Sequence, residues 1–99
     1  MKIEISKMLE RSAEAEGFLK LLANRNRLML LCVLMDEEMS VGELNERVPL
    51  SQSALSQHLS ALRNSGLVTT RRQSKTIYYR LADDRVETVL NTLYQLFCE

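Results

Sequence analysis

The stretch from Leu50 to Leu81 constrains the fold most, because a helical pattern of apolar residues changes there into a strand-like pattern. Three leucines first recur at i, i+4 and i+7, the α-helical period: Leu55, Leu59 and Leu62. Ser51 is a good N-cap residue for such a helix, and Gly66 can adopt the left-handed conformation that often closes one. We therefore predict a helix over about residues 51–64.

The face of this helix opposite the leucines is polar and uncharged. At about 100° per residue it collects five side chains: Ser53, Ser56, Gln57, Ser60 and Asn64. Such side chains can be desolvated against base edges at modest cost, and Gln can pair with adenine while Ser accepts several bases. We expect this recognition helix to enter a DNA major groove. The expected base contacts are Ser53, Ser56, Gln57 and Ser60.

Two segments rich in β-branched and aromatic residues follow, 67–70 and 76–81, and they flank the polar, basic segment 71–75. This pattern predicts a β-hairpin over about residues 67–81. A hairpin with cations at its tip can contact phosphates beside a helix that lies in the groove, which is the role of a wing. The expected phosphate contacts are Arg63, Arg71, Arg72 and Lys75.

The distribution of charge supports a nucleic-acid face more strongly than the total charge does. The chain has 13 Lys and Arg residues and 13 Asp and Glu residues, so its formal net charge is zero. From Val48 to Ala82, however, there is no Asp or Glu, and there are five Lys or Arg residues. Local basicity of this kind is the electrostatic footprint of a nucleic-acid-binding surface. The simpler alternative is a solvated helix followed by an ordinary hairpin.

The segment before this stretch completes a helix-turn-helix. Ser40 and Glu43 have the spacing of a capping box, which predicts a short helix that Pro49 ends. Two short helices joined by so few residues form a helix-turn-helix, in which the second helix enters the groove. The expected fold is mainly α with a small β-hairpin, a single winged helix-turn-helix DNA-binding domain over residues 1–99.

Further helices are expected on both sides of this motif. Amphipathic helices are predicted over about residues 6–22 and 84–97, the second capped by Asp83 or Asp84. Their apolar faces are wider than one small domain needs, so we expect them to form a homodimer whose two recognition helices meet successive major grooves. The alternative is that they close the core of a monomer. A nearly all-apolar helix over 28–35 is expected to be enclosed by other helices.

Several other classes of protein are excluded. No segment reaches the roughly 20 apolar residues of a membrane span, and the N-terminal residues lack the apolar core of a secretory signal, so we expect a cytoplasmic location. There is no Gly-rich phosphate loop, paired-carboxylate constellation or CxxC motif, so we expect neither an enzyme nor a cofactor. His58, the single histidine, is expected at the edge of the core, with one nitrogen bonded to backbone or phosphate.

The order of elements and several motifs resemble the ArsR/SmtB family of winged-helix repressors. The resemblance spans nearly the whole chain and is most specific at Ser56-Gln57-His58-Leu59 and Ser65-Gly66-Leu67-Val68. It implies a homodimer that binds double-stranded operator DNA and usually leaves it when an inducer arrives. Metal-sensing members carry Cys in the first helix of the helix-turn-helix, or Asp, His and Glu on the last helix. Here 41–46 has no Cys and 83–87 has no His, so no metal site is expected.

Two cysteines remain to be explained, Cys32 in the predicted second helix and Cys98 at the end of the last one. In a cytosolic protein, free thiols are most commonly small buried hydrophobes, and that is one interpretation. The other comes from the resemblance, because the BigR, HlyU and SqrR-like branch of the family carries cysteines at both positions. It implies that Cys32 and Cys98 are sensor thiols that reactive sulfur species or oxidants join by a disulfide or a bridge of several sulfurs.

The resemblance implies a repressor that leaves its operator when this cysteine pair is oxidised or bridged. Two alternatives stay open. HlyU-like members of the same branch activate transcription by displacing a nucleoid silencer, and they would use the same DNA contacts. A small dithiol oxidoreductase would instead turn over a thiol substrate and ignore DNA.

Overall fold

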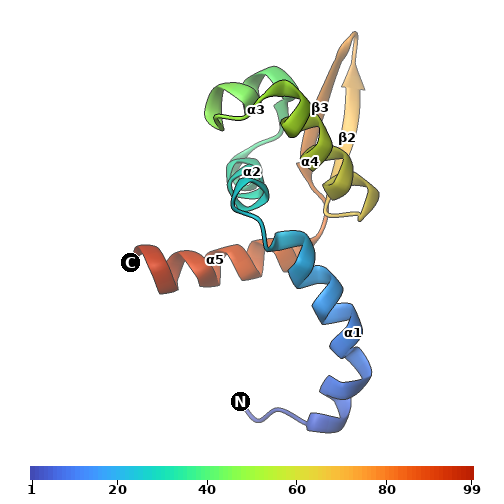
Figure 1. Ribbon diagram of the computed structural model, residues 1–99, viewed down its shortest axis with the longest axis vertical. Helices are drawn as coiled ribbons and strands as arrows, with labels where there is room; N and C mark the ends of the chain where they lie inside the picture. Colours follow the sequence, from blue (N-terminus) through green and yellow to red (C-terminus); the bar gives the residue numbers. More distant parts are fainter.

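The computed structural model describes residues 1–99 as five helices and a small three-stranded sheet (Figure 1). In chain order they are α1 (Ile5–Leu22), α2 (Arg25–Asp36), β1 (Met39–Ser40), α3 (Val41–Arg47), α4 (Gln52–Asn64), β2 (Val68–Gln73), β3 (Thr76–Leu81) and α5 (Asp84–Cys98). The hairpin β2–β3 projects beside α3 and α4, whereas α1 and α5 extend away from this body (Figure 1). The predicted fold, mainly α with a winged helix-turn-helix, is confirmed.

Side-chain caps set the start of both helices of the helix-turn-helix, at the residues that the sequence predicts. At α3, Ser40 Oγ accepts a hydrogen bond from the amide of Glu43 at 3.2 Å, and Glu43 Oε1 accepts one from the amide of Ser40 at 3.0 Å. At α4, Ser51 Oγ accepts from the amide of Ala54 at 3.2 Å. Gly66 has a φ of 79°, so the chain can turn sharply from α4 into β2.

The second helix begins earlier than predicted, at Arg25 rather than near residue 28. The cause is Asn24, whose Oδ1 accepts hydrogen bonds from the amides of Asn26 and Arg27 at 3.0 and 3.2 Å. An asparagine N-cap satisfies amides that otherwise lack partners in the first turn. The polar residues Arg25, Asn26 and Arg27 therefore form the first turn of α2, ahead of the apolar segment on which the prediction was based.

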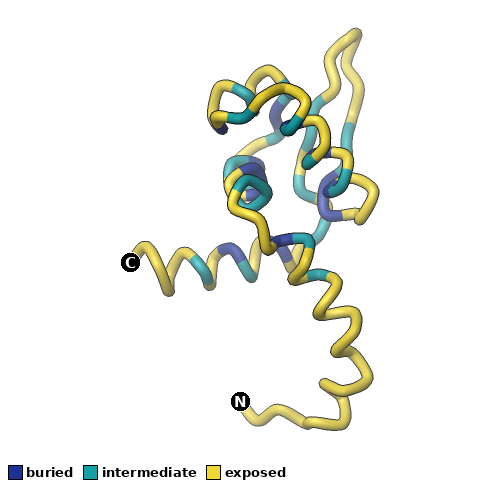
Figure 2. The backbone as a smooth tube through the Cα atoms, in the orientation of Figure 1, coloured by how far each residue is buried: buried dark blue, intermediate teal, exposed yellow.

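Fourteen apolar residues form one buried core, which α2, α3, α4 and the hairpin share with α5. Each leucine of the α4 stripe is no more than 1% exposed, and no polar residue is buried. Figure 2 shows this core between the helices and the hairpin, whereas α1 is exposed along almost its whole length, with Leu22 as its one buried residue. The core therefore fixes α4 and the hairpin and leaves most of α1 outside.

A short strand that no sequence pattern revealed ties the start of the helix-turn-helix to the hairpin. Met39 and Ser40 form β1, which pairs antiparallel with β3, so the strand order is β1-β3-β2. Met39 lies opposite Tyr79 in this register and is 3% exposed. Two residues are too few to show the alternation by which strands are recognised in a sequence.

One face of α2 is less enclosed than its composition predicts. Leu30, Leu31 and Leu34 are buried, but Met29 keeps 48% of its surface exposed and Cys32 is also exposed. The expectation that other helices of the chain surround α2 is therefore wrong for this face. The helix is apolar on a side that the rest of the chain does not cover.

The cap of α5 provides a test of local stability. Asp83 Oδ1 accepts from the amide of Arg85 at 2.9 Å, so Asp83 rather than Asp84 is the cap, and its hydrogen bonds to the Arg85 side chain hold the pKa of Asp83 below its usual value. We expect Asp83→Ala to lower the free energy of unfolding by about 1 kcal/mol at pH 7. Asp84→Ala removes the same charge without removing the cap, and it should cost less.

Urea denaturation of both variants measures this difference. Because the folded-state pKa of Asp83 is lowered, its stabilisation is present above the unfolded pKa of about 3.9 and disappears as pH falls through the folded value. The difference in the free energy of unfolding between the wild-type protein and Asp83→Ala should therefore become smaller in strongly acid solution. Equal losses for the two alanine variants at pH 7 would show that the cap contributes nothing of its own.

Candidate nucleic-acid interface and thiol site

The polar face of α4 is open to solvent. Burial of the leucine stripe turns the opposite side of the helix outward, and the four predicted base contacts are all exposed: Ser53, Ser56, Gln57 and Ser60. Ser53 Oγ lies 3.4 Å from Ser51 Oγ, within the first turn of the helix. The structure thus brings these four side chains together on one exposed helical face, which is the arrangement that reading a groove requires.

Cations lie on both sides of this face. Arg63 is exposed near the end of α4, and Arg72 and Lys75 are exposed at the far end of the hairpin. Arg72 Nε donates a hydrogen bond to the carbonyl oxygen of Ser74 at 3.1 Å, and Ser74 has a φ of 56° in the tight turn between the strands. The far end of the hairpin therefore carries two exposed positive charges, of which Arg72 is held by a hydrogen bond within the chain.

Arg71, the remaining predicted phosphate contact, is already engaged within the chain. Its Nε donates to both carboxylate oxygens of Glu38 at 2.8 and 2.9 Å, its Nη2 also contacts that carboxylate, and its guanidinium lies 4.6 Å from the ring centroid of Tyr78. These hydrogen bonds hold the pKa of Glu38 below its usual range. Both side chains keep part of their surface exposed, and a phosphate contact by Arg71 would require this pair to open. Sequence reasoning missed Glu38 because it lies outside the basic stretch.

His58 lies half-buried at the edge of the core, as expected, but its partner differs from the expected one. Its Nδ1 accepts a hydrogen bond from Nε of Arg27 in α2 at 3.2 Å, in place of a backbone group or a phosphate. Since Nδ1 accepts, the proton of the neutral ring is on Nε2. No spacing rule connects these two residues, which are far apart in the sequence.

The two cysteines open onto the same pocket, where α5 packs against α2 (Figure 1). The pocket has a volume of about 240 Å³, and its other lining residues are all apolar: Leu28, Leu90, Leu93, Tyr94 and Phe97. Cys32 and Cys98 are both free and exposed. The interpretation of the cysteines as buried small hydrophobes is therefore wrong for this chain.

The thiols also influence each other electrostatically. Partial burial raises the pKa of the Cys32 thiol, and charge on Cys98 raises it further. The second effect agrees with the position of Cys98 on the same pocket as Cys32. A thiol pair of this kind can be joined once one member has been oxidised or persulfidated.

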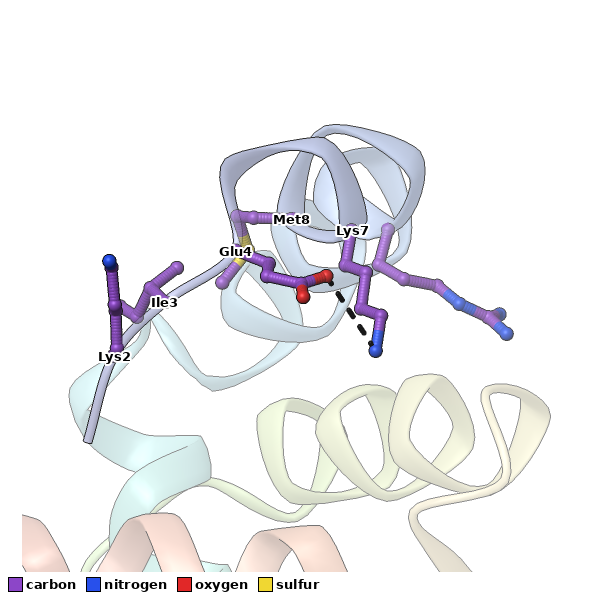
Figure 3. A pocket seen from close by; sticks show the side chains of 6 residues that line it. Lys2, Ile3, Glu4, Lys7 and Met8 are labelled. Atoms are coloured by element: carbon purple, nitrogen blue, oxygen red, sulfur yellow. Dashed lines mark ion pairs between the residues drawn. The ribbon is translucent and has the colours of Figure 1, made fainter.

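An open hollow of about 400 Å³ at the start of α1 is lined by Lys2, Ile3, Glu4, Lys7, Met8 and Arg11. In Figure 3, Glu4 turns towards Lys7, with 3.7 Å between Oε2 and Nζ, while Ile3 and Met8 remain exposed beside them. The hollow brings together no set of metal ligands, and four of its six lining residues are charged.

Two kinds of function find no support in the placement of side chains and helices. No group of three or more His, Cys, Asp or Glu side chains is placed to hold a metal ion. None of the helices is both long enough and apolar enough to span a membrane.

Comparison with known proteins gives consistent matches. Residues 24–70 match the family model described as "bacterial regulatory protein, arsR family". The chain is 46% identical over 97 residues to the transcriptional activator HlyU of Vibrio cholerae, covering 98% of this chain and 90% of that protein. It is 44% identical over 97 residues to the biofilm growth-associated repressor of Agrobacterium fabrum, covering 98% of this chain and 83% of that protein. The crystal structure of the transcriptional repressor BigR from Xylella fastidiosa matches with a TM-score of 0.93 at 42% identity, covering 98% of this chain and 99% of that one.

The electrostatic link between the thiols can be tested by alkylation. A Cys98→Ser variant lacks the charge that Cys98 contributes, so the pKa of Cys32 should fall and its thiolate fraction at pH values near that pKa should rise. We expect iodoacetamide to alkylate Cys32 faster in this variant than in the wild-type protein, as followed by peptide mass spectrometry across pH 7 to 10. In urea, where burial is also removed, the two proteins should react alike. If the alkylation rate of Cys32 has the same pH midpoint in the folded variant as in the wild-type protein, the two thiols do not interact electrostatically.

Proposed function

Because this chain belongs to the ArsR family of bacterial regulatory proteins, we propose that it binds operator DNA and is released when Cys32 is joined to Cys98. The observation that carries the proposal is that both thiols are exposed on the wall of one apolar pocket between α2 and α5. The pocket connects a helix of the DNA-binding core to the last helix of the chain. A bond formed there acts on the geometry of the whole regulator.

The proposed DNA face combines α4 with the hairpin. The serines and Gln57 of α4 contact base edges, while phosphates bind Arg63, Arg72 and Lys75. Arg71 exchanges its exposed bond with Glu38 for a phosphate when DNA arrives. Salt-sensitive phosphate contacts then supply affinity, and the α4 face supplies specificity.

The proposed assembly is a homodimer formed through α1 and α5. Both helices expose large apolar side chains: Ile5 at 66%, Leu9 at 70%, Leu96 at 68% and Phe97 at 79%. A second copy related by a two-fold axis would cover apolar surface on these two helices. Two linked recognition helices then bind two half-sites at once, and each site raises the effective concentration of the other.

The proposed switch converts two thiols into one disulfide. One cysteine attacks the outer sulfur of an organic persulfide, which releases the organic thiol and leaves a cysteine persulfide. The second cysteine then attacks the inner sulfur of that persulfide, forming the Cys32–Cys98 bond and releasing hydrogen sulfide. With a peroxide instead, the first thiol becomes a sulfenic acid with loss of water, and the second displaces a second water. Both routes remove two electrons from the thiol pair.

The bond releases DNA through the position of α5. It ties the end of α5 to α2, and α5 also belongs to the proposed dimer interface. A shift of that helix changes the separation of the two α4 helices, so a dimer can no longer meet both half-sites together. The affinity that comes from simultaneous binding is then lost.

A second function, transcriptional activation, is supported by the 46% identity to an activator, HlyU of Vibrio cholerae. An activator that displaces a nucleoid silencer uses the same α4 and hairpin contacts, and the thiol pair can control it in the same way. The genes beside the operator, and the direction in which their transcription changes on deletion of the regulator, separate the two roles. A dithiol oxidoreductase, the third alternative, would turn over a thiol substrate and show no preference for DNA.

The first test compares DNA binding by the reduced and the bridged protein. Fluorescence anisotropy at fixed salt, with DNA from the region upstream of this protein's own gene, should show specific binding that polysulfide abolishes and a reductant restores. Cys32→Ser and Cys98→Ser proteins should bind as the reduced wild type does and should not respond. A Cys98→Ser protein that still left DNA after polysulfide treatment would refute the thiol switch.

The assignment of the DNA face is tested by two substitutions with different signatures. Gln57→Ala should cost about 1–3 kcal/mol of binding free energy and relax preference at one base pair. Arg72→Ala should weaken binding to all sequences alike and reduce the salt slope by about 1. Both are measured by anisotropy over a salt series with matched and mismatched operators. Unchanged sequence preference in Gln57→Ala would mean that another surface reads the bases.

A further inference from the structure

Resting on the proposed function, we propose that Arg27 is a positioning residue that couples the thiol-bearing helix α2 to the recognition helix α4. Its guanidinium reaches two other helices at once. Nε donates to Nδ1 of His58 in α4 at 3.2 Å, and Nη1 donates to the carbonyl oxygen of Leu21 near the end of α1 at 3.5 Å. Both contacts are partly buried, so solvent competes with them less than with a surface bond.

Arg27 lies on the helix that a bond between the thiols would move. It lies on the same helix as Cys32, and its neighbour Leu28 lines the pocket onto which both cysteines open. The Asn24 cap holds the backbone of Arg27, because Asn24 Oδ1 accepts from the Arg27 amide at 3.2 Å. A movement of α2 caused by a bond at Cys32 therefore carries the root of the Arg27 side chain with it.

The bond to His58 is also the one directional connection between the two helices. The backbones of α2 and α4 make few close approaches, and their remaining shared contacts belong to the apolar core. Apolar contacts tolerate small sliding, whereas a hydrogen bond weakens steeply as its angle and distance change. The Arg27–His58 bond is thus the contact between α2 and α4 that distinguishes one relative position from another.

His58 stands at the boundary between the two faces of α4. Its neighbour Leu59 is 1% exposed in the core, and its other neighbour Gln57 is a proposed base contact. A displacement of the His58 ring therefore acts on the edge of α4 next to the polar face that meets DNA. The core fixes which face of α4 points outward, and the Arg27 bond fixes the position of the His58 edge relative to α2.

The test measures the ratio of operator dissociation constants for the bridged and the reduced protein, by fluorescence anisotropy. Arg27→Met removes the donor and keeps an apolar stem, while Arg25→Met removes the same charge from an exposed position on the same helix. We expect Arg27→Met to reduce the ratio by about tenfold, the size of effect that one hydrogen bond to a charged group can have. Arg25→Met should leave the ratio at its wild-type value.

Two substitutions of the partner give an independent measurement. His58→Phe keeps a ring but has no acceptor, so it should reduce the ratio as Arg27→Met does. His58→Asn places an amide oxygen near the position of Nδ1, so it should retain the coupling. Because both side chains belong to one hydrogen bond, the double variant Arg27→Met with His58→Phe should lower the ratio of dissociation constants no further than either single variant does. Urea denaturation of the reduced proteins confirms that each variant is folded.

The outcomes separate this proposal from the one on which it rests. If the wild-type protein responds to bridging and Arg27→Met responds equally, the coupling role is refuted and the thiol switch stands. If Arg25→Met lowers the ratio of dissociation constants as much as Arg27→Met does, the loss of charge rather than the loss of the hydrogen bond is responsible. The coupling role is then also refuted. If the wild-type protein binds DNA equally in both states, the thiol switch fails and the coupling role fails with it.

Discussion

Burial of the leucine stripe of α4 is the constraint on which the rest of this structure depends. Leu55, Leu59 and Leu62 are each at most 1% exposed, and replacing one such side chain by Ala typically costs about 2–5 kcal/mol. Because these leucines are buried, the opposite face of the helix must point towards solvent. Its serines and Gln57 are exposed because the core takes the opposite side, and the hairpin lies beside them because it packs on the same core.

Local chemistry determined what was predictable from the sequence. The α4 stripe, the Ser40 and Glu43 capping box and the turn at Gly66 all act within a few residues, so their patterns predicted the winged helix-turn-helix correctly. The extent of α2 was predicted less well, because the prediction followed the apolar residues and did not include the polar turn that Asn24 caps. The β1 strand was missed, since two residues carry no periodicity.

Contacts between distant residues account for most of what sequence reasoning missed at the candidate site. The hydrogen bond of Arg71 to Glu38 joins residues 33 positions apart, and that of Arg27 to His58 joins residues 31 positions apart. No rule of spacing relates such pairs; only the folded chain does. The cysteines are an intermediate case, because family resemblance singled out both, but their exposure on one apolar pocket is a property of the packing of α5 on α2.

The exposure of α1 affects how operator occupancy depends on the number of copies of the protein per cell. A helix of 18 residues with a single buried side chain gains little stability from its own chain, since most helical stability in proteins comes from packing of an apolar face. On the proposed dimer, the surface that orders α1 comes from another molecule, so helix formation and assembly follow mass action together. Occupancy of an operator would then rise more steeply than in proportion to the number of chains per cell, up to the square of that number while the protein is mostly monomeric.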